Sequence, residues 1–252
     1  METVKIDKLT YVFKGSGCYV LECDKDAIEV SIKAKVNGET VCGIYVSAFK
    51  DCKELKSVIF EDADSIDYLL SGISFSIGEY AFRNCSSLKK IEIPEYVSSI
   101  CWGAFMECES LEEVEMDEKV YLEPYVFSRC KSLKKTKAKY CNEGTFSFCE
   151  SLKEFPATYE TEEIGDDCFE HCYSLEEIFI PKSVKRIGEL AFRNCRGLKK
   201  ITFEDPNGWK YRSMYGFGNR VFDVDFSDPE RNAIRLRNID FDDGVEEFFK
   251  SN

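Results

Sequence analysis

Apolar positions recur along the middle of the chain in one fixed arrangement. A phenylalanine is followed three residues later by a cysteine, and after three more residues by a leucine. Two further apolar positions follow, separated by one residue, so the unit is F-x-x-C-x-x-L-x-x-I-x-I. The unit occurs seven times, with its phenylalanines at Phe49, Phe82, Phe105, Phe127, Phe146, Phe169 and Phe192.

The spacing of the seven cysteines defines the length of the unit. Successive cysteines, from Cys52 to Cys195, lie 33, 23, 22, 19, 23 and 23 residues apart. A unit of about 23 residues cannot bury its apolar side alone, so successive units must stack into a solenoid. The longer first interval predicts an inserted loop around Ser65–Ser76.

The I-x-I piece of each unit predicts a β-strand, because its apolar residues alternate with a period of two. Stacked units would place these strands side by side as a parallel sheet, about 4.8 Å apart. We therefore predict a mainly β repeat solenoid with a parallel concave sheet and short helical turns. Smaller residues in the middle predict a thinner or more irregular section there, at Thr136, Ala138, Cys141 and Ala157.

The full pattern resembles the BspA-type leucine-rich repeat. Residues Ile77–Pro94, I-G-E-Y-A-F-R-N-C-S-S-L-K-K-I-E-I-P, match the family at every signature position. The resemblance covers about Ile44 to Phe203 and extends more loosely to the N-terminal segment. It implies a leucine-rich-repeat arc that binds proteins and, in exported members, adheres to host or neighbouring-cell proteins.

Three segments are expected: a β-hairpin cap in residues 1–43, the seven repeats in 44–204, and a capping segment with a helix in 205–252. Both ends of a solenoid need a cover, since an open end exposes apolar surface and unpaired strand edges. Near the C-terminus, Ser227-Asp228-Pro229-Glu230 supplies a capping residue, a proline and a first-turn acid. This order predicts a helix over about Pro229–Arg237.

The N-terminal segment predicts two hairpins. The first would join strands around Tyr11–Phe13 and Cys18–Leu21. The second would join Ile28–Ile32 to Thr40–Tyr45 through a turn at Asn37-Gly38.

The cysteines are better explained by packing than by chemistry. Thirteen is an odd number, so at least one thiol stays unpaired within a monomer. The seven repeat cysteines stand at core positions, which predicts buried, unreactive thiols. Cys168-x-x-His171-Cys172 has a metal-like spacing, but both cysteines occupy packing positions and no second pair completes a tetrahedral set. We expect no metal and no cofactor.

Catalysis and nucleic-acid binding are also disfavoured. The chain has one histidine and no phosphate-binding or dinucleotide motif, so a nucleophile–base pair is hard to build. Its net charge of −13 repels phosphate backbones and anionic lipids. No apolar run approaches the roughly 20 residues needed to cross a bilayer, so membrane insertion is not expected. The N-terminus lacks the pattern of a secretory signal, which favours a cytoplasmic protein unless a leader was removed.

Two columns of residues would point outward from these strands: the residue just before each I-x-I piece, and the residue between its two apolar positions. The first column mostly alternates in charge, which is typical of a ladder that fixes strand register. It comprises Ser57, Lys90, Glu113, Lys135, Glu154, Glu177 and Lys200. The second column is irregular and partly apolar, as a recognition surface requires. Its candidate partner-binding residues are Ile59, Glu92, Glu115, Lys137, Phe179 and Thr202.

These observations favour a non-enzymatic module that binds a protein partner through its sheet face, in an intracellular scaffold or regulatory subunit. Two alternatives stay open. One is a cell-surface adhesin whose leader has been removed, and the other is a structural spacer in a larger assembly. No oligomeric state is predicted.

Overall fold

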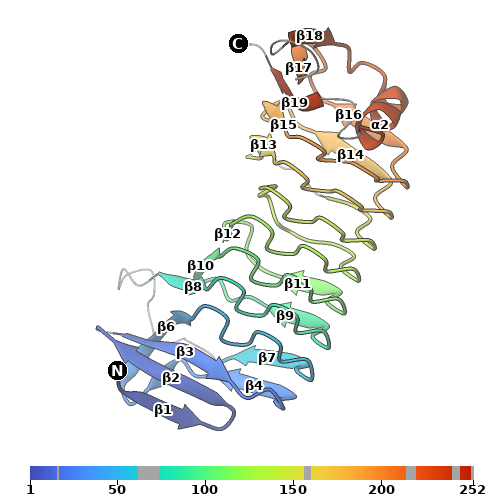
Figure 1. The fold of residues 1–252 in the computed structure, drawn as a ribbon. Coiled ribbons are helices and arrows are strands. Elements are labelled where there is room, and N and C mark those ends of the chain that lie inside the picture. Colours follow the sequence, from blue (N-terminus) through green and yellow to red (C-terminus); the bar gives the residue numbers. More distant parts are fainter. Residues whose placement is uncertain (16, 62–73, 156–159, 214–219, 240–244, 251–252) are drawn as a thin grey trace.

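The chain coils into a solenoid with strands packed on both of its ends (Figure 1). The computed structural model describes residues 1–15, 17–61, 74–155, 160–213, 220–239 and 245–250. The predicted leucine-rich-repeat solenoid, mainly β, is confirmed. No helix among the described residues is long and apolar enough to cross a membrane.

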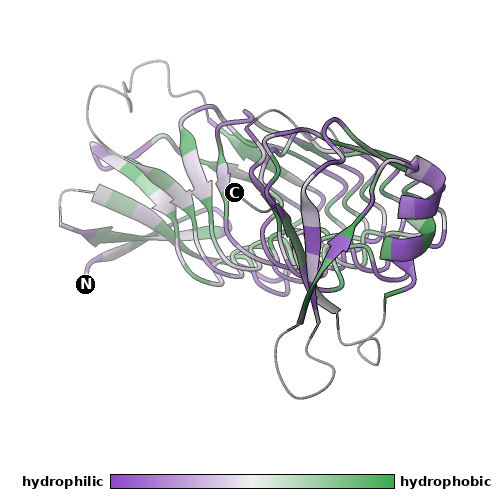
Figure 2. Cartoon of the chain, turned by 90° about the horizontal axis from the view of Figure 1, so that it is seen from above, coloured by the Kyte–Doolittle hydropathy of each residue, from purple (hydrophilic) through white to green (hydrophobic). Residues whose placement is uncertain are grey.

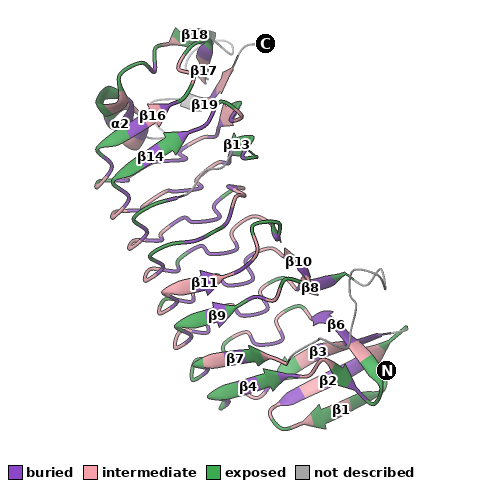
Figure 3. Ribbon diagram, turned by 180° about the vertical axis from the view of Figure 1, so that it is seen from behind, coloured by how far each residue is buried: buried purple, intermediate pink, exposed green. Residues whose placement is uncertain are grey.

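Strands from successive coils, except in the middle of the solenoid, form a parallel ladder along one side of the molecule, here called the first ladder. Its buried residues are those of the I-x-I pattern, and the residues between them face outward (Figure 3), as in Ile178, Phe179 and Ile180. Three strand pairs are parallel and in register: β4 (Glu29–Ile32) with β7 (Ser57–Phe60), β9 (Lys90–Glu92) with β11 (Glu113–Glu115), and β14 (Glu177–Ile180) with β16 (Lys200–Phe203).

A second parallel ladder, which we did not predict, runs along another side of the coils. Its strands come from the V-x-x-I stretch, whose apolar residues are three apart. Val97 and Ile100 are nevertheless both buried, because the register shifts between Val97 and Ser99 and turns both residues inward. The strands are β6 (Glu39–Ile44), β8 (Phe75–Ile77), β10 (Val97–Ile100), β12 (Tyr121–Leu122), β13 (Glu163–Ile164) and β15 (Arg186–Ile187).

The middle of the solenoid is irregular, as its small residues predicted. Both ladders are reduced there to isolated bridges, between Glu113 and Lys135 and between Cys141 and Ile164. Thr136 and Ala138 are still buried, whereas Ala157 lies outside the described residues. Most of the expected inserted loop also lies outside them, and its end, Phe75-Ser76, belongs to β8.

The N-terminal segment forms one hairpin as predicted and differs in the second. β1 (Thr3–Ile6), β2 (Leu9–Lys14) and β3 (Gly17–Cys23) are antiparallel neighbours. β5 (Lys35–Val36) and β6 meet across the expected Asn37-Gly38 turn. The prediction that Ile28–Ile32 pairs with Thr40–Tyr45 is wrong. β4 pairs with β7 as one more rung of the first ladder, because that position buries Val30 and Ile32 on the first repeat.

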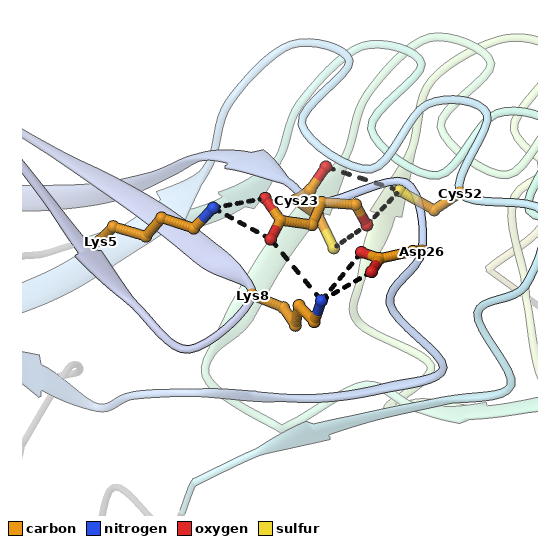
Figure 4. Close-up of polar contacts among 6 residues, drawn as sticks. Lys5, Lys8, Cys23, Asp26 and Cys52 are labelled. Atoms are coloured by element: carbon orange, nitrogen blue, oxygen red, sulfur yellow. Dashed lines mark hydrogen bonds and ion pairs between the residues drawn. The ribbon is translucent and has the colours of Figure 1, made fainter.

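Ion pairs attach β1 and the turn after it to the segment that follows β3 (Figure 4). Lys5 Nζ lies 2.7 Å from Asp24 Oδ1, and Lys8 Nζ lies 2.8 Å from Asp26 Oδ2. Behind them, the Cys52 thiol contacts the Cys23 carbonyl oxygen at 3.9 Å. The repeat cysteine column therefore begins at the cap.

The C-terminal segment forms the predicted helix, α2 (Pro229–Arg237), and three strands that we did not predict. Asp228 caps α2 by accepting hydrogen bonds from the backbone N–H groups of Glu230 and Arg231, both at 3.1 Å. The three strands extend the second ladder beyond β15 in antiparallel pairs. In spatial order they are β19 (Val245–Lys250), β17 (Trp209–Ser213) and β18 (Arg220–Val224).

Columns of identical side chains fill the core, and the apolar segments recur from coil to coil (Figure 2). The seven repeat phenylalanine rings stack, with neighbouring centroids 4.5 to 5.9 Å apart and interplanar angles of 2° to 18°. From Cys85 onward, each repeat thiol donates a hydrogen bond to the phenylalanine carbonyl of the preceding coil, at 2.9 to 3.2 Å. Cysteine suits this position because it is small, apolar and a weak donor.

Candidate protein-binding face

The outward surface of the first ladder carries both predicted columns. In the first column, Glu113 lies between two lysines: Lys90 Nζ is 3.7 Å from one carboxylate oxygen and Lys135 Nζ is 3.3 Å from the other. The alternating charges thus attract each other from coil to coil. Attraction of this kind between neighbouring strands favours the observed register in the middle coils.

The second column lies on the same face, with its residues on successive strands. Strand register aligns Glu92 with Glu115 and Phe179 with Thr202. Two large apolar side chains stand out in it, since Ile59 is 59% exposed and Phe179 is 43% exposed. Such exposure in the centre of a sheet face is what a binding surface shows, because burial of these groups by a partner is favourable.

A shallow groove of about 1190 Å³ crosses this face over β7, β9 and β11. It brings together four of the six candidate residues: Ile59, Glu92, Glu115 and Lys137. Phe179 and Thr202 do not line it, because they belong to β14 and β16 farther along the solenoid (Figure 1). The predicted residues therefore form two parts of one face rather than a single site.

Ion pairs compensate the like charges inside the groove. Glu92 and Glu115 lie side by side on β9 and β11. Lys90 Nζ is 3.2 Å from Glu92 Oε1, and Lys137 Nζ is 3.0 Å from Glu115 Oε2. The Lys137 ammonium lowers the pKa of the Glu115 carboxyl, and the Glu92 carboxylate raises the pKa of the Lys90 ammonium. These pairs are solvent-exposed and therefore weak, so charged groups of a partner can replace either member of a pair at little cost in free energy.

Comparison with known sequences agrees with this architecture. The model of the BspA type leucine-rich repeat region matches residues 43–156 and 136–220, with six copies, which is well over half of the chain. The chain belongs to the BspA-type leucine-rich repeat family. No curated protein sequence matches this BspA-type protein.

Several solved structures resemble this BspA-type protein. A leucine-rich repeat protein of T. pallidum is 23% identical, with 81% of this chain and 84% of that chain covered and a TM-score of 0.55. One from Bacteroides ovatus is 25% identical, with 81% and 71% covered and a TM-score of 0.44. A leucine rich cell surface protein from Faecalibacterium prausnitzii is 16% identical, with 82% and 96% covered and a TM-score of 0.30. The first of these supports the fold alone.

The groove of this BspA-type protein also contains residues that we did not single out from the sequence. Lys56 and Lys89 stand immediately before β7 and β9, and Glu95, Asp117 and Glu118 follow β9 and β11. The sequence did contain a signal for these residues, because residues that flank parallel strands come together along the two sides of a sheet. The direction in which the chain turns after each strand brings them to the groove, and that direction is not encoded in the strand pattern.

The side chains of the Cys168–Cys172 cluster pack in the core or against neighbouring rings. Cys168 and Cys172 are fully buried. His171 stacks on Phe148, with ring centroids 4.3 Å apart, and its Nδ1 lies 2.7 Å from the Tyr173 hydroxyl. Burial lowers the pKa of His171. Within the described ranges, no group of three histidine, cysteine or acidic side chains is placed to hold a metal.

Proposed function

We propose that this BspA-type solenoid is a non-enzymatic module that binds a protein partner through the outward face of its first ladder. The observation that carries the proposal is the exposure of Ile59 in the floor of the groove. Solubility alone favours polar residues there, and the neighbouring strands do place charged residues at the same position. Exposed apolar anchors surrounded by charged side chains are typical of protein interfaces.

Of the settings that the sequence leaves open, the family supports the cell-surface adhesin better than the intracellular scaffold. A core rich in free thiols is an objection to export, because accessible thiols oxidise outside the cell. The structure weakens that objection, because the seven repeat cysteines are each 0% exposed. Burial also raises the pKa of Cys130, Cys149, Cys172 and Cys195, which keeps these thiols protonated and slow to oxidise.

Substitution of the anchor tests the proposal. Ile59→Arg places a charge where a partner would bury an apolar side chain, and we expect it to weaken partner capture at least ten-fold. The tagged protein would be incubated with surface and cytosolic fractions of the cells that produce it. Captured proteins would be quantified by mass spectrometry for wild type and variant.

Ile234→Arg is the matched control, because Ile234 is 54% exposed but lies on α2, near the opposite end of the solenoid from the groove (Figure 1). Wild type and Ile234→Arg should capture the same proteins, in the surface fraction if the protein is an adhesin. Equal capture by wild type and Ile59→Arg would contradict binding through this face. Capture of no specific protein by any of the three would instead favour the structural spacer.

A further inference from the structure

The groove has opposite charges on its two sides, and we propose that it binds an extended peptide segment with matching polarity. In this segment, acidic residues stand at one end, an aliphatic residue in the middle and basic residues at the other end. The proposal rests on the proposed function and specifies the chemistry of the partner.

Strand direction creates the polarity. β7, β9 and β11 lie next to one another in the stack and run parallel (Figure 1), so all their N-terminal ends lie on one side of the groove. Lys56, Lys89 and Lys90 stand at that side. Glu95, Asp117 and Glu118 stand beyond the C-terminal ends, on the opposite side. The groove is therefore basic along one rim and acidic along the other.

Rim charges are available to a partner. Among the residues that the structure describes, Lys56, Lys89, Glu95 and Glu118 lie within ion-pair distance of no oppositely charged side chain, whereas Lys90 on the basic rim and the charges in the middle of the groove are already paired. A bound segment can thus supply the missing counter-charges at both rims. The field of the whole protein does not favour a uniformly acidic ligand, because the net charge is −13.

The exposed side chain of Ile59 favours an apolar residue in the middle of the bound segment. It lies between the two rims, on the floor of the groove, and it is 59% exposed. Lys89 and Glu95 are six residues apart along a strand and the turn after it, which corresponds to roughly 15–20 Å. A peptide of about six or seven extended residues spans that distance with a central leucine over Ile59.

Two synthetic peptides of identical composition test the polarity. The first, Glu-Asp-Ala-Leu-Ala-Lys-Arg, separates its charges, and the second, Glu-Lys-Ala-Leu-Ala-Asp-Arg, mixes them. Binding of each blocked, fluorescent peptide would be followed by anisotropy at low ionic strength. We expect the first peptide to bind about ten-fold more tightly, and its affinity to fall as salt is added, because the contacts are exposed ion pairs.

Reversal of one rim provides the decisive variant. Glu95→Lys/Glu118→Lys should weaken the first peptide about ten-fold and leave the second nearly unchanged. Glu54→Lys/Glu162→Lys is the control, since it makes the same change in net charge at exposed positions outside the groove. Absence of binding, equal affinity for both peptides, or equal loss in both variants would overturn the proposal. The proposed function would still stand if Ile59→Arg lost its captured proteins.

Discussion

The repeat cysteine both fills space in the core and donates a hydrogen bond between coils. Cys130 fills the space beside the stacked phenylalanine rings and donates from Sγ to the Phe105 carbonyl at 3.2 Å. Alanine would leave a gap and remove the donor, and a larger apolar side chain would not fit between the coils. These requirements explain why the same residue type recurs in every coil.

Cys130→Ala should therefore lower the free energy of unfolding by about 1–2 kcal/mol, from lost contacts and a lost weak hydrogen bond. Urea denaturation followed by circular dichroism measures this change. Cys101→Ala serves as the comparison, because Cys101 is only partly buried and stands outside the column. An equal loss in both variants would show that the column position confers no special stability.

Asp167 is a residue that disfavours folding at neutral pH. Burial, together with the nearby Glu170, Asp166 and Glu143 carboxylates, raises its pKa to about 6 from an ordinary 3.8. The folded state thus binds the proton more tightly than the unfolded state does. The ionised side chain destabilises the fold above about pH 6, and this penalty declines as the pH falls from 6 toward 4.

Asp167→Asn removes the charge and suits the local backbone, since Asp167 has a φ of 52° and asparagine tolerates that region. After allowance for solvent screening, we expect a gain of about 1 kcal/mol at pH 7.5 and almost none at pH 4. Thermal unfolding at the two pH values measures it. Asp223→Asn, at a side chain 93% exposed, should change nothing at either pH. A pH-independent gain would rule out the titration of Asp167 as its cause.

Among the elements, α2 takes the place of a missing coil. In each repeat, the residue before the cysteine donates its N–H to the next coil, as His171 does to the Arg193 carbonyl at 2.8 Å. In the last repeat, the Asn194 N–H donates instead to the Arg237 carbonyl, at the end of α2, at 3.0 Å. The Arg237 guanidinium also donates to the Leu198 carbonyl at 2.7 Å. The helix therefore accepts the hydrogen bond that a further coil would otherwise accept.

Asn232 fastens α2 to the last coil. Its side-chain amide donates to the Ile201 carbonyl of β16 at 3.1 Å and to the Phe226 carbonyl at 2.9 Å. Asn232→Ala should cost about 2 kcal/mol, because both bonds are buried. Amide hydrogen exchange in α2 should accelerate more than exchange in the repeats. Asn238→Ala, at an exposed position after the helix, is the control. Unchanged exchange in α2 would show that other contacts hold the helix.

Elements with local signals could be predicted from the sequence, and elements that depend on distant pairing could not. The first ladder follows from period-two alternation, and α2 from Asp228 and Pro229. The second ladder needed the register shift after Val97, which turns a spacing of three into a shared buried face. β17 does alternate, since the aromatic residues Trp209 and Tyr211 are each followed by a basic residue, yet its partner β19 lies more than 30 residues away in the chain.

At the scale of the whole molecule, the candidate face was predictable in outline only. Repeat register places Ile59 and Phe179 on one side, and the structure agrees. The groove was not predictable, because it depends on where the chain turns after β9 and β11 and brings Glu95 and Glu118 to its rim. A net charge of −13 likewise gave no sign that four lysines line this groove together with five acidic residues.

The hydrogen bonds between coils also determine how the molecule responds to force. They run from one coil to the next, as in the bond from the Phe82 N–H to the Ala104 carbonyl at 2.7 Å, and the two chain ends lie at opposite ends of the stack (Figure 1). Tension between the ends therefore loads one coil boundary after another, rather than shearing all of them together. Each coil of about 23 residues releases roughly 80 Å of chain when it opens. Under tension the solenoid therefore lengthens in steps, one coil at a time, and absorbs work at each step.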